Sequence, residues 1–169
     1  MREEQIILLA EDREDDILLI RRAFEKAGFG NRLQVVRDGE QAVAYLTGQA
    51  EYADRTRHPL PDLLLLDLKM PRMDGFEVLK WIREHPAFCL LRVIVLASSG
   101  QIRDINLAYE LGANSFLVKP LEFDQFVEIA RTLKYWVQTS KAPELRAPPA
   151  IPSTQAPPPD RLSSSPPPP

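Results

Sequence analysis

Acidic residues and a lysine stand directly after three short apolar runs of this sequence. Glu11 and Asp12 follow one run, Asp67 follows another, and Lys119 follows a third. Carboxylates held close together repel one another, and a hard divalent cation such as Mg²⁺ relieves the repulsion by taking their oxygen atoms as ligands. A phosphoryl group at such a site would meet a metal and an ammonium group that neutralise its charge, while an aspartate oxygen attacks phosphorus. These residue types therefore favour phosphoryl transfer onto a carboxylate, with the metal as an electrostatic clamp.

The apolar runs have the composition of buried strands, and segments of helical periodicity alternate with them. The runs cover residues 6–10, 33–36, 63–66, 93–97 and 116–118. Three of the helical segments stop at a glycine, namely Gly28, Gly48 and Gly112, and the third segment begins with Asp74 and Glu77 at the spacing of a capping box. Five strand–helix pairs in strict alternation predict an α/β fold, a doubly wound five-stranded parallel sheet with helices on both faces.

Such a fold tells us where to look for chemistry, because ligands bind outside the carboxyl ends of the strands. Each residue named above also has an ordinary explanation. Glu11 and Asp12 could favour a helix N-terminus, Asp67 could be a loop acid, and Lys119 could be solvated. Four such residues at the ends of three predicted strands are much harder to explain as ordinary surface residues. The sequence has no evident Ser-His-Asp set, P-loop or GxGxxG fingerprint.

Bulk composition indicates one domain without a membrane segment. The chain has 169 residues, a formal net charge of −3 and a single cysteine, Cys89. The charge argues against a broad nucleic-acid footprint, and one cysteine excludes an internal disulfide framework. We find no signal peptide and no apolar run of membrane-spanning length, so we expect a soluble, cytoplasmic protein with no direct contact to nucleic acid or membrane.

The last thirty residues differ sharply in composition from the rest. Residues 140–169 hold eleven of the sixteen prolines and end in three serines followed by four prolines. Proline removes a backbone donor, and the few apolar residues cannot bury enough surface to offset the cost of ordering. We expect a domain over residues 1–139 and a disordered Pro/Ser-rich tail over 140–169. This tail is either a docking peptide for a proline-reading partner or a plain solvated segment.

Four motifs of the sequence resemble the receiver domain of two-component response regulators. They are "IILLAEDREDD", "LLLLDLKMPRMDG", "VIVLASSG" and "GANSFLVKP", and they occur in order over residues 5–138. The resemblance implies the (βα)5 flavodoxin-like receiver fold. It also implies a signalling phosphoacceptor that promotes only its own phosphorylation and dephosphorylation, and is not otherwise an enzyme.

The resemblance further implies a role for each matching residue. Asp67 would be the phosphoacceptor, and Asp12 and Asp67 would bind Mg²⁺ directly, with Glu11 acting through water and the backbone carbonyl of Lys69 as the remaining protein ligand. Lys119 would pair with the phosphoryl oxygens.

Four further residues have structural or switching roles in the family. Pro120 would follow a cis peptide bond that aims the lysine into the site. Pro71 and Gly75 belong to the loop after the acceptor, and Phe116 occupies the aromatic switch position.

One position departs from the family pattern. At the end of the fourth strand, where the family has Thr or Ser, this chain has Ala97, followed by Ser98 and Ser99. Alanine cannot bond a phosphoryl group, and strand alternation turns Ser98 to the opposite side unless the strand end is irregular. The usual conformational coupling is therefore in question at this position, because one contact that distinguishes the two states is absent.

The chain most resembles stand-alone receivers that partner with phytochrome-type histidine kinases. We see no DNA-binding or catalytic output domain after the receiver, so we expect output through protein–protein contacts. Ile129, Leu133 and Trp136 could form a second apolar face on the last helix. That face would be a homodimer or kinase interface, or it would pack under the longer loop between Gly48 and Asp62.

Three functions remain open from the sequence. The leading one is acceptance of a phosphoryl group from a sensor histidine kinase onto Asp67 with Mg²⁺. The alternative, motivated by Ala97, is a phosphorylation-independent interaction module on a receiver scaffold. A third, a phosphohydrolase with an aspartyl nucleophile, has less support, because dehalogenase-type phosphatases place an acid two residues after the nucleophile and this chain has Lys69 there.

Overall fold

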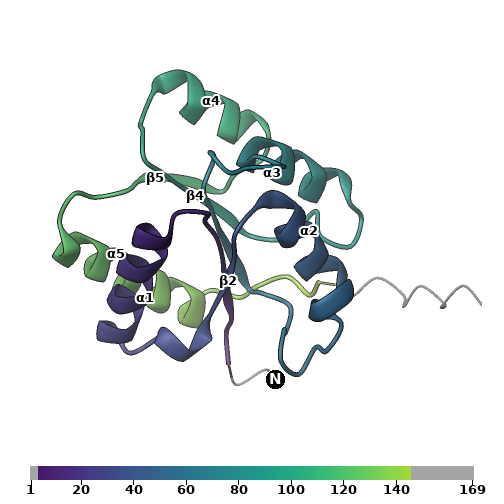
Figure 1. Ribbon diagram of the computed structural model, residues 1–169, viewed down its shortest axis with the longest axis horizontal. Helices are drawn as coiled ribbons and strands as arrows, with labels where there is room; N and C mark the ends of the chain where they lie inside the picture. The colour runs from purple at the N-terminus through teal and green to yellow at the C-terminus, as the bar shows by residue number, and fades with distance from the viewer. Residues whose placement is uncertain (1–3, 146–169) are drawn as a thin grey trace, which may run out of the picture.

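The computed structural model describes residues 4–145, in which five parallel strands lie between two layers of helices (Figure 1). The strands are β1 Ile7–Ala10, β2 Leu33–Val36, β3 Leu63–Leu66, β4 Val93–Ala97 and β5 Ser115–Val118. The helices are α1 Glu14–Lys26, α2 Gly39–Thr47, α3 Gly75–Glu84, α4 Ile102–Glu110 and α5 Phe123–Thr139, with short 3-10 turns η1 Gly30–Arg32 and η2 Ala50–Tyr52. The predicted doubly wound parallel fold is confirmed.

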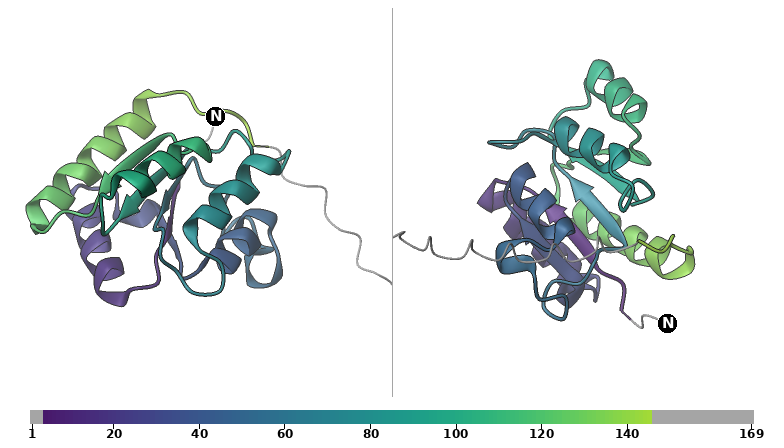
Figure 2. Two further views of the ribbon diagram at one scale, coloured as in Figure 1. Left: turned by 90° about the horizontal axis from the view of Figure 1, so that it is seen from above. Right: turned by 90° about the vertical axis from the view of Figure 1, so that its right-hand side faces the viewer.

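Alternate residues of the central strands point to opposite faces of the sheet and pack into two separate hydrophobic cores. Leu8 and Leu64 face a cluster formed with α2, α3 and α4, whereas Leu9 and Leu65 face a cluster formed with α1 and α5. The further views in Figure 2 show these helical layers on either side of the sheet. Both faces of β1, β3 and β4 are buried, as the continuous apolar runs predicted. The edge strands β2 and β5 are only partly buried, because each has one neighbour instead of two.

The helix ends follow the local signals in the sequence. Gly28, Gly48 and Gly112 all have positive φ, of 72°, 69° and 100°, which a residue without Cβ adopts readily. Asp74 and Glu77 form the predicted capping box at the start of α3. These signals are local, so they could be read correctly without knowledge of tertiary contacts.

The apolar face expected on α5 packs largely within the domain. Leu133 is buried in the cluster beneath α1 and α5, and Ile129 and Trp136 pack against the same cluster. The guanidinium of Arg92 lies 4.6 Å from the Trp136 ring centroid and donates a hydrogen bond to Ser140. Much of this face is therefore already occupied by contacts within one chain, through Arg92 and not beneath the loop after α2.

The chain beyond α5 remains in contact with the domain as far as it is described. Leu145 packs against the core on the side of α2 and α3. Most of the Pro/Ser-rich segment, residues 146–169, lies outside the described residues, so the expected disorder of the tail stays a prediction. Among residues 4–145, no helix combines the length and apolar character needed to cross a bilayer.

Candidate functional site

The strand order brings the ends of β1 and β3 side by side. The sheet runs β2-β1-β3-β4-β5, and Ala10, the last residue of β1, pairs with Leu66, the last residue of β3. The backbone N–H of Asp67 donates to the Ala10 carbonyl at 3.0 Å. The chain leaves β1 for one side of the sheet and β3 for the other, so this is the crevice in which ligands of such folds bind.

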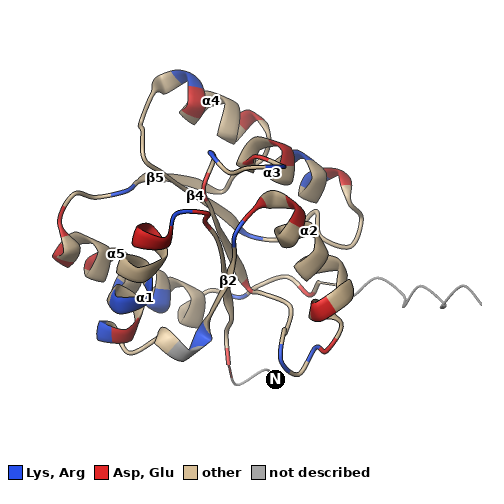
Figure 3. Ribbon diagram, viewed as in Figure 1, with Lys and Arg blue, Asp and Glu red and all other residues tan. Residues whose placement is uncertain are grey.

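Three carboxylates converge in that crevice. Glu11, Asp12 and Asp67 each offer an oxygen atom, and these three atoms lie within 4.8 Å of one another. Glu11 is fully buried and Asp67 is 5% exposed. One buried oxygen of Asp12 has no hydrogen-bond partner among the described residues. Acids also crowd the first turn of α1, as Figure 3 shows in red. A hard divalent cation fits this all-oxygen donor set, because it would satisfy the orphaned oxygen and offset the repulsion.

Lys119 supplies the positive charge of the site. Its Nζ lies 2.5 Å from Glu11 Oε2, 2.9 Å from Asp16 Oδ2 and 3.6 Å from Asp67 Oδ1. β4 separates β5 from β3, so the lysine backbone lies roughly 10 Å from that of Asp67, two strand spacings away. A long side chain can cover that distance over the end of β4, where the small Ala97 stands.

Burial and neighbouring charges together shift the pKa values of the groups in the site. Poor solvation in the crevice raises the pKa of Asp67; Lys119 opposes the shift, and the negative charges of Asp12 and Asp16 add to it. Burial likewise raises the pKa of Glu11. The pKa of Lys119 is raised even though burial lowers it, because its hydrogen bonds to Glu11 and Asp16 favour the ammonium form. The site therefore favours the protonated form of Lys119, whereas burial disfavours the ionised forms of Asp67 and Glu11.

The raised pKa of Asp67 predicts a pH dependence of stability in the metal-free protein. The unfolded carboxyl titrates near 3.8 and the folded one at higher pH, so within that window the folded state binds more protons. The free energy of unfolding should therefore fall as pH rises through the window. Urea unfolding without divalent metal, at a series of pH values, should show a shallower fall for Asp67→Asn. Asp54→Asn, which removes an exposed carboxyl of lowered pKa, should leave the fall in place. If the free energy of unfolding fell equally with pH in wild type and in Asp67→Asn, the raised pKa of Asp67 would be contradicted.

The loop between β3 and α3 wraps closely around Asp67. The N–H of Gly75 donates to the Leu68 carbonyl at 2.9 Å, and a Cβ added at Gly75 would lie 2.2 Å from the carbonyl oxygen of Asp67. A groove of about 540 Å³ opens beside Asp12, with Lys69, Pro71 and Asp104 among its lining residues. Of the three clustered carboxylates, only Asp12 lines this groove.

The remaining predicted residues lie around the site without joining the acidic cluster. Ala97 is buried at the end of β4, and Ser98 after it is exposed. Phe116 on β5 packs partly against the core shared with α2 and α3. The side chain of Lys69 is exposed.

The expected cis peptide before Pro120 is wrong. No cis peptide bond occurs among residues 4–145. The trans form of an X–Pro bond is favoured by about 0.5–1 kcal/mol unless tertiary contacts select the other isomer. Lys119 reaches Glu11 and Asp16 with the trans bond, so aiming the lysine does not require the cis isomer.

Sequence reasoning missed Asp16 as a partner of Lys119. Asp16 lies in the first turn of α1 and accepts a hydrogen bond from the lysine at 2.9 Å. Asp12 precedes the extended N-cap residue Arg13 and is not part of the helix, so no helical spacing from Asp12 marked Asp16 in the sequence.

Comparison with known proteins identifies the family. The family model described as the response regulator receiver domain matches residues 7–131. The chain belongs to this family. The receiver is also similar to the response regulator Rcp1 of Synechocystis sp., with 33% identity over 140 residues that cover 82% of this chain and 93% of that protein.

Solved structures of related response regulators match the receiver closely. RPA3017, a response regulator in red light signalling of R. palustris, is 38% identical with a TM-score of 0.77. RcpA, a cyanobacterial phytochrome response regulator solved in phosphorylated form, is 34% identical with a TM-score of 0.75. The Mn²⁺-bound form of Rcp1 is 33% identical with a TM-score of 0.72. Each comparison covers 83% of this chain and 99% of the other.

These findings fix the class of function. The receiver is homologous to stand-alone response regulators, and its neighbours in structure are phytochrome-associated ones. The family is one of signalling phosphoacceptors and not of classical enzymes, and the cluster of Glu11, Asp12 and Asp67 fits a phosphoacceptor site that binds a divalent metal. The alternative of a phosphorylation-independent module is not favoured.

Proposed function

We propose that Asp67 accepts a phosphoryl group from the phosphohistidine of a sensor kinase. A carboxylate oxygen of Asp67 attacks phosphorus as the phosphorus–nitrogen bond breaks, and the electron pair of that bond stays with the imidazole. The observation that carries the proposal is the convergence of three carboxylate oxygens within 4.8 Å, with Lys119 Nζ 3.6 Å from Asp67 Oδ1. Lys119 then has a position from which its ammonium can pair with phosphoryl oxygens.

Mg²⁺ is the proposed metal. Asp12 and Asp67 would hold it directly, Glu11 through water and Lys69 through its backbone carbonyl. When bound, the cation supplies positive charge against the phosphoryl oxygens. The all-oxygen donor set and the unpartnered oxygen of Asp12 support this assignment, as does the Mn²⁺-bound form of Rcp1.

The proposed donor is a phytochrome-type histidine kinase in the cytoplasm. Two observations support this proposal. RcpA is a phytochrome response regulator and RPA3017 is a response regulator in red light signalling, and the single cysteine of this chain suits a reducing compartment. Output passes to other proteins by direct contact. Homodimers and docking of the Pro/Ser-rich tail remain part of the hypothesis.

Intact-mass measurement after incubation with Mg²⁺ and a small-molecule phosphodonor tests the phosphoacceptor. Wild type should gain the mass of one phosphoryl group, and Asp67→Asn should gain none. Asp104→Asn is the matched control, because Asp104 lines the groove without joining the three clustered carboxylates, and it should gain the same mass as wild type. A gain that survives Asp67→Asn would contradict the proposal.

A further inference from the structure

An ion pair outside the acidic cluster, between a buried carboxylate and a half-exposed arginine, joins two loops at the same edge of the sheet. Asp38, in the loop between β2 and α2, is 1% exposed. One carboxylate oxygen accepts a hydrogen bond from the Gln41 N–H at 2.8 Å and so caps α2. The other accepts from Nε and Nη2 of Arg72 at 2.8 and 2.5 Å. Both oxygens are occupied, and Arg72 supplies the charge that a buried carboxylate requires.

Arg72 holds a backbone conformation that glycine ordinarily adopts. Its φ is 66°, in the left-handed region. That region is energetically unfavourable for a residue with a side chain, because Cβ comes too close to the backbone carbonyl oxygen. A glycine at this position would avoid the cost but could not reach Asp38. The contact to Asp38 is therefore an interaction that can offset the strain and hold the loop in this shape.

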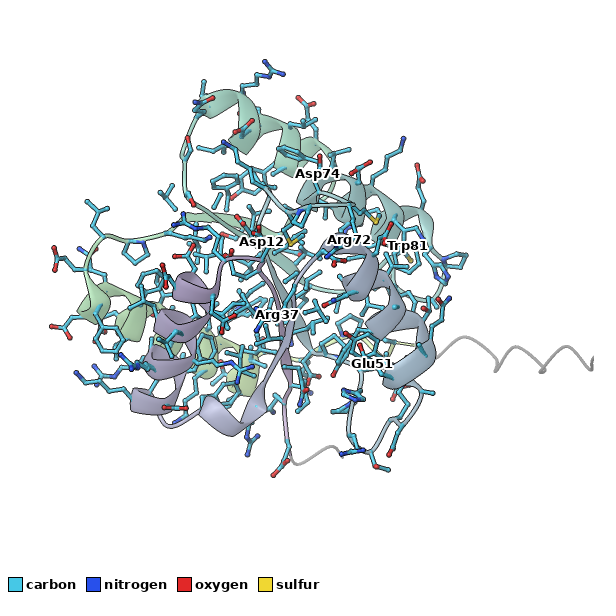
Figure 4. The ribbon with its side chains drawn as sticks, viewed as in Figure 1. Asp12, Arg37, Glu51, Arg72, Asp74 and Trp81 are labelled. Atoms are coloured by element: carbon cyan, nitrogen blue, oxygen red, sulfur yellow. The ribbon has the colours of Figure 1, made fainter. Side chains whose placement is uncertain are left out.

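The neighbouring residues of the two loops complete the connection. The N–H of Gly39 donates to the Met73 carbonyl at 3.1 Å, and a Cβ added at Gly39 would lie 2.3 Å from that oxygen. Two consecutive residues at the start of α2, Asp38 and Gly39, thus bind two consecutive residues of the loop between β3 and α3. In Figure 4, Arg72 and Asp74 of this loop lie toward the same end of the sheet as Asp12.

The loop between β3 and α3, which Arg72 connects to Asp38, also contains the proposed backbone ligand of the metal. Lys69 stands three residues before Arg72, between it and the acceptor Asp67. A side-chain ligand can adjust by rotation, whereas a carbonyl ligand moves only when the backbone moves. Contacts that orient ligands from outside the coordination shell typically change metal affinity by about 10–100-fold.

We propose that Asp38 and Arg72 are positioning residues that set the affinity of the acidic cluster for a divalent cation. They act through the backbone of the loop between β3 and α3 and touch neither metal nor phosphoryl group. The inference rests on the metal site of the proposed function, which it deepens.

The double variant Asp38→Asn/Arg72→Gly tests the proposal. Asparagine keeps the cap on α2, and glycine relieves the left-handed strain. The two changes together leave net charge unaltered and no buried charge unpaired. We expect cooperative unfolding at a temperature close to that of wild type, but Mn²⁺ binding about tenfold weaker, measured from the electron paramagnetic resonance signal of free Mn²⁺.

The matched control removes a different ion pair from the same region. Arg37, next to Asp38, pairs with Glu14 on α1, and both side chains are largely exposed. The charge-neutral variant Glu14→Gln/Arg37→Ala should bind Mn²⁺ within twofold of wild type. If the double variant at 38 and 72 unfolds, the single variant Asp38→Asn keeps the cap and carries the same expectation of weaker binding.

The outcomes separate this proposal from the proposed function. Wild-type affinity for Mn²⁺ in Asp38→Asn/Arg72→Gly overturns the positioning role and leaves the phosphoacceptor intact. A wild-type protein that binds Mn²⁺ but gains no phosphoryl mass overturns the phosphoacceptor alone. A wild-type protein that does not bind Mn²⁺ overturns both.

Discussion

Replacing Lys119 with methionine should slow phosphorylation of Asp67 by about a hundredfold or more, the effect typical of removing one donor to developing charge. The same change should destabilise the protein near neutral pH by about 3 kcal/mol, because removing one partner of a buried ion pair leaves the other charges uncompensated. Lys119 is only 7% exposed and contacts Glu11, Asp16 and Asp67, so three carboxylates lose their counter-charge at once.

The pH dependence distinguishes an electrostatic role from a packing role. Protonation removes the repulsion among the carboxyls, so the stability lost in Lys119→Met should be partly recovered at mildly acidic pH. Chemical unfolding at two pH values measures this recovery, and intact mass against time measures phosphorylation. Lys26→Met is the control, since Lys26 pairs with Asp124 at an exposed site and should contribute less than about 1 kcal/mol. Phosphorylation of Lys119→Met at the wild-type rate would contradict the role of the lysine.

Gly75→Ala should destabilise the protein by about 3 kcal/mol, at the upper end for an overpacked site, and abolish phosphorylation. Local propensity predicts the opposite, because alanine within a helix is favoured over glycine by about 1 kcal/mol. Tertiary contact decides the outcome. The new Cβ would lie 2.2 Å from the carbonyl oxygen of Asp67 and 2.8 Å from Leu68 Cα, both of them backbone atoms that cannot rotate away.

Gly100→Ala is the matched control for the glycine variant. A Cβ at Gly100 would meet only Val118 Cγ2 at 2.9 Å, the end of a side chain that is 47% exposed and can move. Gly100→Ala should lower the free energy of unfolding by less than about 1 kcal/mol. Thermal unfolding and intact-mass measurement should therefore separate the two variants. Equal stability of the two would contradict the close approach of Gly75 to the acceptor backbone.

The elements of this fold were predictable because their signals are local. Continuous apolar runs marked the three central strands, and glycines marked three helix ends, at positions that the structure reproduces. The general rule about strand ends then brought Glu11, Asp12, Asp67 and Lys119 to one edge without any knowledge of contacts. Partial exposure of β2 and β5 was not predicted, because apolar runs alone do not say which strands lie at an edge.

The sequence by itself determined the fold class and the acidic character of the strand ends, since both depend on residue type and periodicity. Only the tertiary structure decided which distant groups meet. Strand order, side-chain reach and loop shape decide three such features. They are the ion pair of Asp16 with Lys119, the ion pair of Asp38 with Arg72, and the trans bond before Pro120. Residues 34 positions apart along the chain, such as Asp38 and Arg72, carry no mark of each other in a single sequence. Their contact is decided by how the two loops cross at the edge of the folded sheet.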